Sequence, residues 1–326
     1  MFSDKESQFN LMDRLSLQGA PFFFIIDFLM NNIEIYTPQA LEEANISIDF
    51  RGFKQNLISP ESLPEPLLWE AFPESLAAYA SGFHQVQWHL KKGNSYLANY
   101  TRKTKVSTNL SLPQIFAHTK AKYKLLYPEK WVCFSPETFV EIKKNTIATY
   151  PMKGTIEASL PNAEERLKQS TKEKAEHYTV VDLLRNDLST VADAVEVKKF
   201  QHIDFLQTQQ KNLYAMSSEI VGQLKPEFQN KIGQMMKKLL PAGSILGAPK
   251  PKTLELILEA EGYDRGFYTG VAGWFDGENL DSCVLIRWIE QTEDGLYFKS
   301  GGGITHQSQL EEEYQEMKNK IYVPIY

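Results

Sequence analysis

The chain has 326 residues, enough for one large or two modest domains that each bury a core. Its 42% hydrophobic and 23% charged residues are ordinary globular usage, which excludes a disordered chain, a collagen-like fibre and a disulfide scaffold. The 35 Lys and Arg against 41 Asp and Glu give a net charge of -6, so no overall positive field would attract nucleic acid or an anionic membrane.

Neither a signal peptide nor a membrane span is predicted near the start of the chain, and the two cysteines favour a cytosolic protein. Its first residues, MFSDKESQFNLMDRLS, are charged and lack the apolar region of a signal peptide. Residues 21–30 are the most apolar stretch, but they are too short for a membrane span and Asp27 interrupts them, so they predict a core strand. Cys133 and Cys283 lie in apolar runs without CxxC spacing, which favours buried reduced thiols.

The predicted elements alternate long helices with consecutive strands. We expect strands at 22–27, 32–36 and 46–50, a surface connection at 59–73, a helix at 74–91, and strands at 96–105, 131–134, 138–142 and 146–150. Helices at 163–185, 227–239 and 251–261 precede strands at 267–275, 282–290 and 296–300 and a last helix at 309–321. Asp-Gly pairs at 276–277 and 294–295 predict hairpin turns. This order predicts the α+β class, with two packed mixed or antiparallel sheets flanked by helices. The absence of a long linker predicts one domain over 1–326.

Glu137 and Lys153 are the first candidate site residues. Two apolar strands flank Lys143-Lys144-Asn145, and a hairpin turning near Lys144 places Glu137 opposite about residue 151. Both side chains would then share the open end of the hairpin, in irregular backbone next to Pro and Gly. The alternative is that each is a solvated surface residue.

Two pairs of carboxylates form a second group. Asn162 and Glu165 have capping-box spacing, and the helix after them aligns Glu173 and Glu176 with its inward apolar stripe, which continues through Val180, Leu184 and Asp187. Ser308 and Glu311 have the same spacing before the last helix, where Glu313 and Glu316 lie one turn apart. Four converging glutamates would suit Mg²⁺. Surface pairing and a solvated acidic turn are the alternatives.

The third group contains possible anion sites. Gly301, Gly302 and Gly303 follow a predicted strand and precede the last helix, so their amides could form an anion-binding nest. PAGSILGAPK (241–250) leads into a helix N-terminus. Arg287 lies within an apolar strand, and a buried guanidinium requires a bidentate anion or a structural salt bridge.

Together these segments resemble the chorismate-utilising enzymes, most closely their para-aminobenzoate synthase branch, the aminodeoxychorismate synthase component I enzymes. The matching strings are SPETF (135–139), PMKGT (151–155), EKAEHYTVVDLLRNDLS (173–189), PAGSILGAPK (241–250), YTGVAGWF (268–275), DSCVLIR (281–287) and GGGITHQSQLEEEYQE (301–316). GNSYLANYT (93–101) resembles an upstream strand of the family, so 93–326 forms the motif core and 1–90 is weakly covered.

The resemblance implies a reaction and a set of roles. Lys153 stands where relatives of the anthranilate synthase type carry a small residue, which implies covalent attack on C2 of chorismate. Glu137 matches the general acid/base that assists departure of the C4 hydroxyl, after which ammonia adds at C4. A desolvated pocket with nearby cations would lower the lysine pKa.

The remaining implied roles concern binding. Glu173, Glu176, Glu313 and Glu316 would hold Mg²⁺ and the ring carboxylate. Tyr268, Arg287 and the amides of residues 301–303 would hold the enolpyruvyl carboxylate, and Ser244 and Lys250 would also contact substrate. The implied protein is a cytoplasmic transferase of folate biosynthesis whose ammonia comes from a glutamine amidotransferase subunit, component II.

Two positions depart from the family pattern. Residues 215–218 read AMSS where the family usually has a histidine followed by Leu-Val-Ser, and Leu246 replaces a usual threonine. The missing imidazole fits a reaction that stops at aminodeoxychorismate. The alternatives are an anthranilate or isochorismate type of enzyme and a catalytically silent chorismate-binding subunit.

Overall fold

The computed structural model describes residues 4–206 and 212–325. The chain divides into two compact units, each assembled from segments distant in sequence. Unit 1 comprises Met1–Pro21, Thr138–Ser244 and Phe275–Ser282, and unit 2 comprises Phe22–Glu137, Ile245–Trp274 and Cys283–Tyr326. The single domain expected from the sequence stays a prediction.

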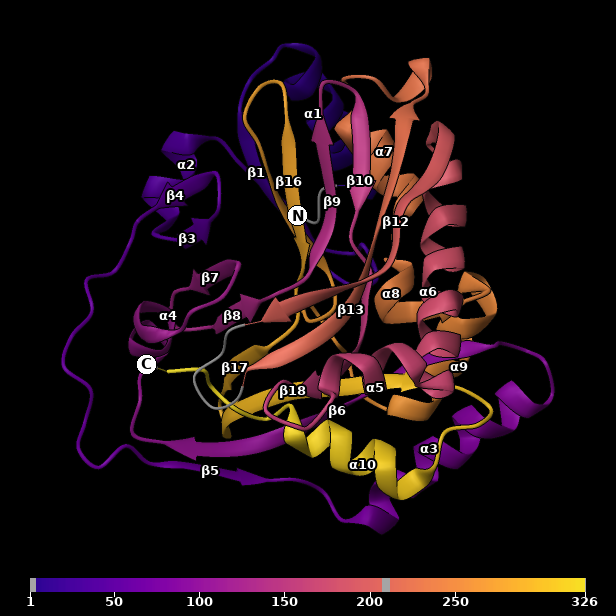
Figure 1. Ribbon diagram of the computed structural model, residues 1–326. Helices are drawn as coiled ribbons and strands as arrows, with labels where there is room; N and C mark the ends of the chain where they lie inside the picture. Colours follow the sequence, from indigo (N-terminus) through magenta and orange to yellow (C-terminus); the bar gives the residue numbers. More distant parts are fainter. Residues whose placement is uncertain (1–3, 207–211, 326) are drawn as a thin grey trace. The chain divides into compact units, whose positions relative to one another are not determined.

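Antiparallel sheets flanked by helices form the framework, which confirms the α+β class (Figure 1). The helices are α1 (Lys5–Leu17), α2 (Pro38–Ala44), α3 (Leu76–Lys91), α4 (Leu112–His118), α5 (Ala163–Gln169), α6 (Thr171–Ser189), α7 (Ile232–Leu239), α8 (Gly243–Leu246), α9 (Lys250–Glu261) and α10 (Leu310–Asn319), with a 3-10 turn, η1, at Pro226–Phe228. The strands in the first half of the chain are β1 (Phe22–Ile26), β2 (Ile33–Tyr36), β3 (Ser47–Phe50), β4 (Phe53–Gln55), β5 (Trp69–Phe72), β6 (Leu97–Thr108), β7 (Tyr123–Tyr127), β8 (Trp131–Ser135), β9 (Thr138–Lys143), β10 (Thr146–Thr149) and β11 (Met152–Glu157). Those in the second half are β12 (Ala192–Leu206), β13 (Leu213–Leu224), β14 (Gly247–Ala248), β15 (Val271–Phe275), β16 (Leu280–Val284), β17 (Trp288–Thr292) and β18 (Gly295–Ile304).

In unit 1, the long strand β13 is the centre of the strand pairing. It pairs with β10, β11 and β12, and β10 also pairs with β9. The β9–β10 hairpin has the expected register, because Lys143 lies opposite Thr146 and the turn residues Lys144 and Asn145 take positive φ values of 49° and 66°. Helix α6 packs against β11, β12 and β13. Its buried residues Val180 and Leu184 confirm the inward stripe.

In unit 2, strands follow the order β14-β6-β18-β17-β8-β7-β3-β4, with β5 paired to β6, and β1 pairs with β2. Every residue of β1 is buried, as expected for the apolar stretch at the beginning of the chain. Phe23 and Ile25 of this strand join a core cluster with Tyr123, Trp131 and Trp288. Burial of each such side chain stabilises the fold by about 1.5 to 3 kcal/mol. Both Cys133 and Cys283 are free and buried, as predicted.

Several expected boundaries are wrong for local reasons. The helix expected at 163–185 is interrupted at Ser170, whose backbone is extended and whose side chain caps α6. Asn162 has a φ of 54° and makes no side-chain cap, so the capping box there is absent. Gln309 rather than Ser308 is the N-cap of α10, again without a side-chain bond. The helix expected at 227–239 is the turn η1 followed by the shorter α7.

Several further elements lie where the sequence predicted none, and the longest of them are α1, β12 and β13. Helix α1 packs against α7, where the absent side chain of Gly233 lets the two backbones meet; a Cβ there would lie 1.9 Å from the carbonyl oxygen of Phe9. Within the described residues, no helix is long and apolar enough to cross a membrane.

Candidate active site

Lys153 lies on a strand rather than in the loop expected from its Pro and Gly neighbours. It faces Met216 across the β11–β13 pairing, and the register shifts between Lys153 and Thr155. Paired residues share a face of a sheet, as do residues two apart in a strand. Lys153, Met216 and Ser218 therefore share one face, and Ser218 places it against α6 through its contact with His177. Among the residues that the structure describes, no hydrogen bond or ion pair holds the half-buried Lys153 ammonium.

Glu173 of α6 lies against the backbone that follows Lys153. A Cβ on Gly154 would be 2.7 Å from Oε2 of Glu173, and Gly154 has a φ of 76° that other residues rarely adopt. The glycine thus allows the carboxylate to approach β11. Unit 1 therefore places Glu173 against the residue that follows Lys153, while Glu176 is half-buried one turn along α6.

His177 is a site residue that the sequence reasoning missed. Its side chain is fully buried, and a hydrogen bond of 2.7 Å joins its Nε2 to Oγ of Ser218. Ser218 Oγ also accepts the backbone N–H of Gln201. Burial lowers the pKa of His177 to about 4, with smaller effects from His202 and from the charge of Lys153. The imidazole is therefore neutral at pH 7.

The position of His177 was readable in principle, because it follows Glu173 by four residues on the inward stripe of α6. Its contact with Ser218 also bears on the segment 215–218, which lacks the imidazole usual in the family. An imidazole does reach this segment, but it comes from α6 rather than from the strand itself.

In unit 2, Glu313 and Glu316 of α10 converge on Gly302. A Cβ at Gly302 would lie 3.3 Å from Oε1 of Glu316, 3.5 Å from Oε2 of Glu313 and 3.7 Å from Nζ of Lys320. Lys320 Nζ donates to the carbonyl oxygen of Gly301 and to Oε1 of Glu316, each at 2.7 Å. The sequence reasoning missed this cation, although its i,i+4 spacing from Glu316 was visible.

The turn expected at the three glycines is wrong, and the contact of their amides with substrate stays a prediction. Gly301, Gly302 and Gly303 belong to β18 and lie opposite Thr101, Tyr100 and Asn99 of β6, so they form part of an antiparallel ladder. Glycine serves two purposes here: a Cβ on Gly301 would lie 2.3 Å from the carbonyl oxygen of Tyr100, and at Gly302 the missing side chain leaves space for the carboxylates.

Arg287 lies in a break between two strands, which corrects both parts of its prediction. Strand β16 ends at Val284 and β17 begins at Trp288, and Arg287 has a φ of 56° that a strand cannot accommodate. The side chain is half-buried rather than buried. Its guanidinium lies 5.7 Å from the ring centroid of Tyr322.

Tyr268 is buried in the core of unit 2, and its predicted binding role stays a prediction. Burial raises the pKa of its hydroxyl, and the charges of Arg265 and Arg287 oppose that rise only in part. The hydroxyl therefore stays protonated and can donate a hydrogen bond to an anion. Arg287 lies close enough to influence this pKa, so the two predicted receptors of one carboxylate are near each other.

The other predicted residues lie at element ends. Glu137 of unit 2 lies between β8 and β9, where its N–H donates to Ser135 Oγ and its carbonyl oxygen accepts the N–H of Val284, each at 3.1 Å. Ser244 of unit 1 is on the short helix α8, and Lys250 of unit 2 begins α9, whose range confirms the predicted helix. The approach of Glu137 to Lys153 and the substrate contacts of Ser244 and Lys250 stay predictions.

The donors available for a metal are all carboxylate oxygens, which fit a hard cation such as Mg²⁺ and not zinc. Glu313 and Glu316 converge at Gly302 in unit 2, and Glu173 lies at Gly154 in unit 1. Among the described residues, no group of three or more His, Cys, Asp or Glu side chains converges. The centre of four glutamates therefore stays a prediction.

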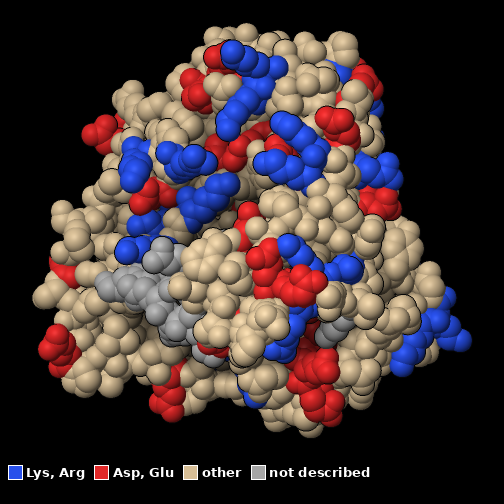
Figure 2. Space-filling view, viewed as in Figure 1, with Lys and Arg blue, Asp and Glu red and all other residues tan. Residues whose placement is uncertain are grey.

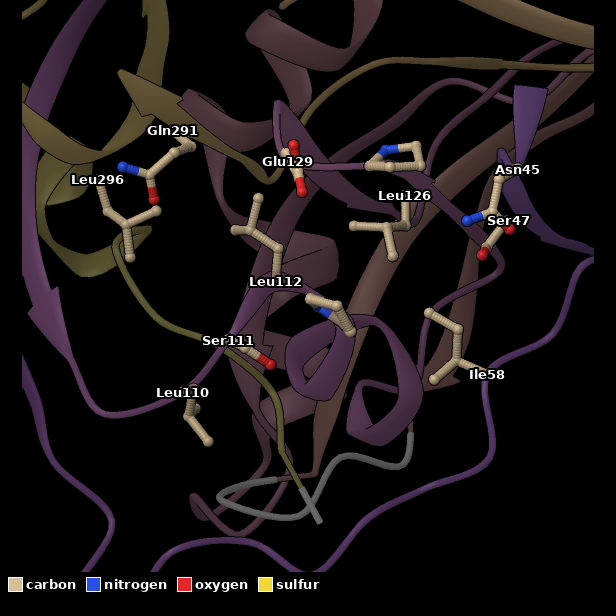
Figure 3. Close-up of a pocket in the computed structure, with 12 residues that line it drawn as sticks. Asn45, Ser47, Ile58, Leu110, Ser111, Leu112, Leu126, Glu129, Gln291 and Leu296 are labelled. Atoms are coloured by element: carbon tan, nitrogen blue, oxygen red, sulfur yellow. The ribbon is translucent and has the colours of Figure 1, made fainter. Parts of the chain in front are cut away.

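A hollow of about 430 Å³ lies elsewhere in unit 2 (Figure 3). Leu112 and Leu126 lie near its centre, and among its 12 lining residues Glu129 alone is charged. None of the predicted site residues lines it. The opposite charges are intermixed over the molecular face that Figure 2 shows, in keeping with the weakly negative net charge.

Comparison with known proteins identifies the family. The family model described as "chorismate binding enzyme" matches residues 23–325. The chain belongs to this family.

Three similar proteins illustrate its range. An uncharacterised PabA-like protein of Pasteurella multocida is 52% identical over 309 residues, which are 94% of this chain and 95% of that protein. Aminodeoxychorismate synthase component 1 of Escherichia coli is 33% identical over 258 residues, 74% of this chain and 56% of that protein. The solved structure of a putative 2,3-dihydroxybenzoate-specific isochorismate synthase of Bacillus anthracis has a TM-score of 0.74 at 20% identity, covering 97% of this chain and 87% of that one. The last likeness confirms the fold of the chorismate-binding family.

As a member of this family the chain acts on chorismate, a diacid. The described geometry provides matching chemistry in each unit. Unit 1 offers an unpaired amine beside a carboxylate and a neutral imidazole. Unit 2 offers paired carboxylates, a half-buried guanidinium and a buried phenol.

Proposed function

We propose that the protein is an aminodeoxychorismate synthase component I, which converts chorismate and ammonia to 4-amino-4-deoxychorismate in the cytosol. The observation that carries the proposal is Lys153. Its ammonium has no partner among the described residues, although it is half-buried on a sheet face beside Glu173. A lysine used only for structure would be expected to pair with that carboxylate or to reach solvent.

The proposed reaction has two displacements. The neutral amine of Lys153 forms a bond to C2 of chorismate, the ring double bonds shift, and the C4 hydroxyl leaves as water with a proton from Glu137. Ammonia then forms a bond to C4, the double bonds shift back, and the bond from C2 to Lys153 breaks. Hydroxide is a poor leaving group, and its protonation is worth on the order of 10² to 10⁴ in rate.

The substrate's two carboxylates require separate receptors. Mg²⁺ held by Glu173, Glu176, Glu313 and Glu316 would neutralise the ring carboxylate, and Lys320 would offset part of the remaining negative charge. Tyr268 and Arg287 would receive the enolpyruvyl carboxylate through a neutral donor and a bidentate fork. The amides of Gly301 to Gly303, now placed on a strand rather than in a turn, would contribute further donors to that carboxylate. We further propose that ammonia comes from a glutamine amidotransferase subunit.

Replacement of Lys153 by alanine tests the proposal most directly. We expect the wild-type chain with chorismate, Mg²⁺ and ammonium to give aminodeoxychorismate by mass spectrometry. Lys153→Ala should lose turnover by at least about 10³-fold while keeping the same thermal unfolding midpoint. Lys168→Ala, which removes an exposed lysine of unit 1, is the matched control and should keep full activity.

Other products would contradict the proposal. Anthranilate or isochorismate from the wild-type chain would assign it to another branch of the family. Tight chorismate binding without consumption, even with the amidotransferase subunit present, would indicate a catalytically silent subunit. Activity that survives removal of divalent ions with EDTA would contradict the Mg²⁺ assignment, whereas loss with recovery on adding Mg²⁺ would support it.

A further inference from the structure

The guanidinium of Arg287 is held in an unusual way. Its backbone lies in the left-handed region between β16 and β17, and this turn takes the side chain out of the alternation of the strands. Phe134 N–H donates to the Arg287 carbonyl oxygen at 3.1 Å, which fixes the backbone of the turn to β8. The position of the side chain therefore depends on a fixed backbone and on whatever the guanidinium contacts.

No charged partner holds this guanidinium. Among the described residues, Arg287 has no hydrogen bond or ion pair from its side chain. The contact that the structure does provide is the ring of Tyr322, whose centroid is 5.7 Å from Cζ of Arg287. This distance lies within the range of about 6 Å in which a cation is attracted to an aromatic face.

Tyr322 is itself held on both sides along the chain. Before it, α10 ends with Lys320, which binds Glu316 and the carbonyl oxygen of Gly301, and the next residue, Ile321, is buried. After it, Ile325 forms an isolated antiparallel bridge with Thr119. The segment 320–325, here called the C-terminal strap, thus runs from the carboxylates of α10 past Arg287 to the end of α4.

We propose that Tyr322 is a positioning residue for Arg287 and thereby sets the affinity for a carboxylate of the substrate. The contact with an aromatic ring needs no N–H donor, so the donors of the guanidinium remain available for a bidentate anion. A carboxylate partner in place of Tyr322 would occupy those donors. The inference rests on the proposed function in one respect, namely that Arg287 receives the enolpyruvyl carboxylate.

Chorismate binding, measured by calorimetric titration with Mg²⁺ present, tests this role. We expect Tyr322→Ala to raise the Kd for chorismate about two- to five-fold, the range expected for loss of one cation–π contact to a ring that is 38% exposed. Tyr322→Phe keeps the ring and should stay within about two-fold of wild type. Tyr322→Leu keeps apolar volume without the aromatic face, so it should resemble alanine. In turnover, the alanine variant should show a raised KM and an unchanged kcat.

A double-mutant cycle separates positioning from general packing. In an Arg287→Ala background, Tyr322→Ala should change the Kd by less than about two-fold, because no guanidinium is left to position. Equal Kd values for wild type and Tyr322→Ala would overturn this inference but leave the proposed function intact. So would an equal loss of chorismate affinity on Tyr322→Ala in the wild-type and Arg287→Ala backgrounds. A wild-type chain that binds no chorismate would overturn the proposed function, and the inference with it.

Discussion

Arg265 and Arg287 both belong to unit 2, and their guanidinium groups have opposite surroundings. Arg265 is fully buried and donates to both carboxylate oxygens of Glu261, at 2.6 and 2.8 Å. Its other N–H groups reach the carbonyl oxygens of Ile245 and Asn99 and the hydroxyl of Thr269. Burial alone would lower the pKa of Arg265, but the Glu261 carboxylate outweighs that effect and raises it.

Arg287 has none of these partners among the described residues and lies near an aromatic ring instead. These surroundings correspond to two different uses of an arginine. Arg265 has its donors occupied within the fold, so it holds α9 to its neighbours and can offer little to a ligand. Arg287 keeps its donors free in a half-buried place, which is the arrangement that suits anion binding.

The largest effect should follow from breaking the Arg265 pair. Glu261→Gln leaves a fully buried guanidinium without its counter-charge, which we expect to lower the free energy of unfolding by about 3 to 5 kcal/mol. Urea unfolding followed by circular dichroism measures it. Arg287→Ala is the matched control and should lose less than about 1 kcal/mol. Similar losses for the two variants would show that the surroundings do not distinguish the arginines.

Arg287 should instead matter for binding. Loss of a buried, charge-assisted contact costs about 2 to 5 kcal/mol, so we expect Arg287→Ala to weaken chorismate binding by at least about 30-fold. Arg287→Lys restores the charge but not the planar fork, and should recover only part of the affinity. Full recovery by lysine would indicate that charge alone is recognised.

His177 is a buried group with the opposite behaviour to Arg265, because the fold favours its neutral form rather than its charged form. Its pKa is about 4 in the folded chain, below the ordinary 6.5, so the unfolded chain takes up the proton first as the pH falls. The free energy of unfolding should therefore be unaffected by this group above pH 6.5 and should fall between pH 6.5 and 4, by at most about 3 kcal/mol. Unfolding in urea at several pH values should show this slope in wild type relative to His177→Gln. The same pH dependence of the free energy of unfolding in wild type and His177→Gln would contradict the assignment of this effect to His177.

The smallest effect concerns a charge pair exposed to water. Lys168 and Glu164 pair across one turn of α5, with side chains 48% and 47% exposed. Solvent screening leaves such pairs little net stabilisation, so Lys168→Ala should leave the urea midpoint of unfolding unchanged within error. A lower midpoint in the same urea titrations would show that exposure does not decide the worth of a pair in this protein.

The sequence predicted well those features that depend on neighbours along the chain. The register of the β9–β10 hairpin follows from two apolar runs around Lys144 and Asn145, and the inward stripe of α6 follows from helical spacing. Both features can be predicted from the sequence because each depends on the spacing of residues within a few helical turns or two adjacent strands. The place of Glu173 beside β11 was therefore within reach of the sequence, although its contact at Gly154 was not.

The features that were missed depend on partners far along the chain. Strand β12 carries many polar and exposed residues and has several register shifts against β13, whereas β13 has four consecutive buried residues, so neither shows a clean alternation. The left-handed turn at Arg287 is hidden in an apolar run that reads as one continuous strand. Gly301 to Gly303 resemble a loop in sequence, and only the pairing with β6 makes them a strand.

The backbone conformation at Arg287 also bears on protein engineering. Glycine adopts a φ near 56° without the steric cost of about 1 to 2 kcal/mol that other residues meet there. A heat-resistance screen would therefore be expected to enrich glycine at this position. The selected variants would be more stable to heat but would bind substrate poorly, because glycine lacks the guanidinium that we assign to substrate binding.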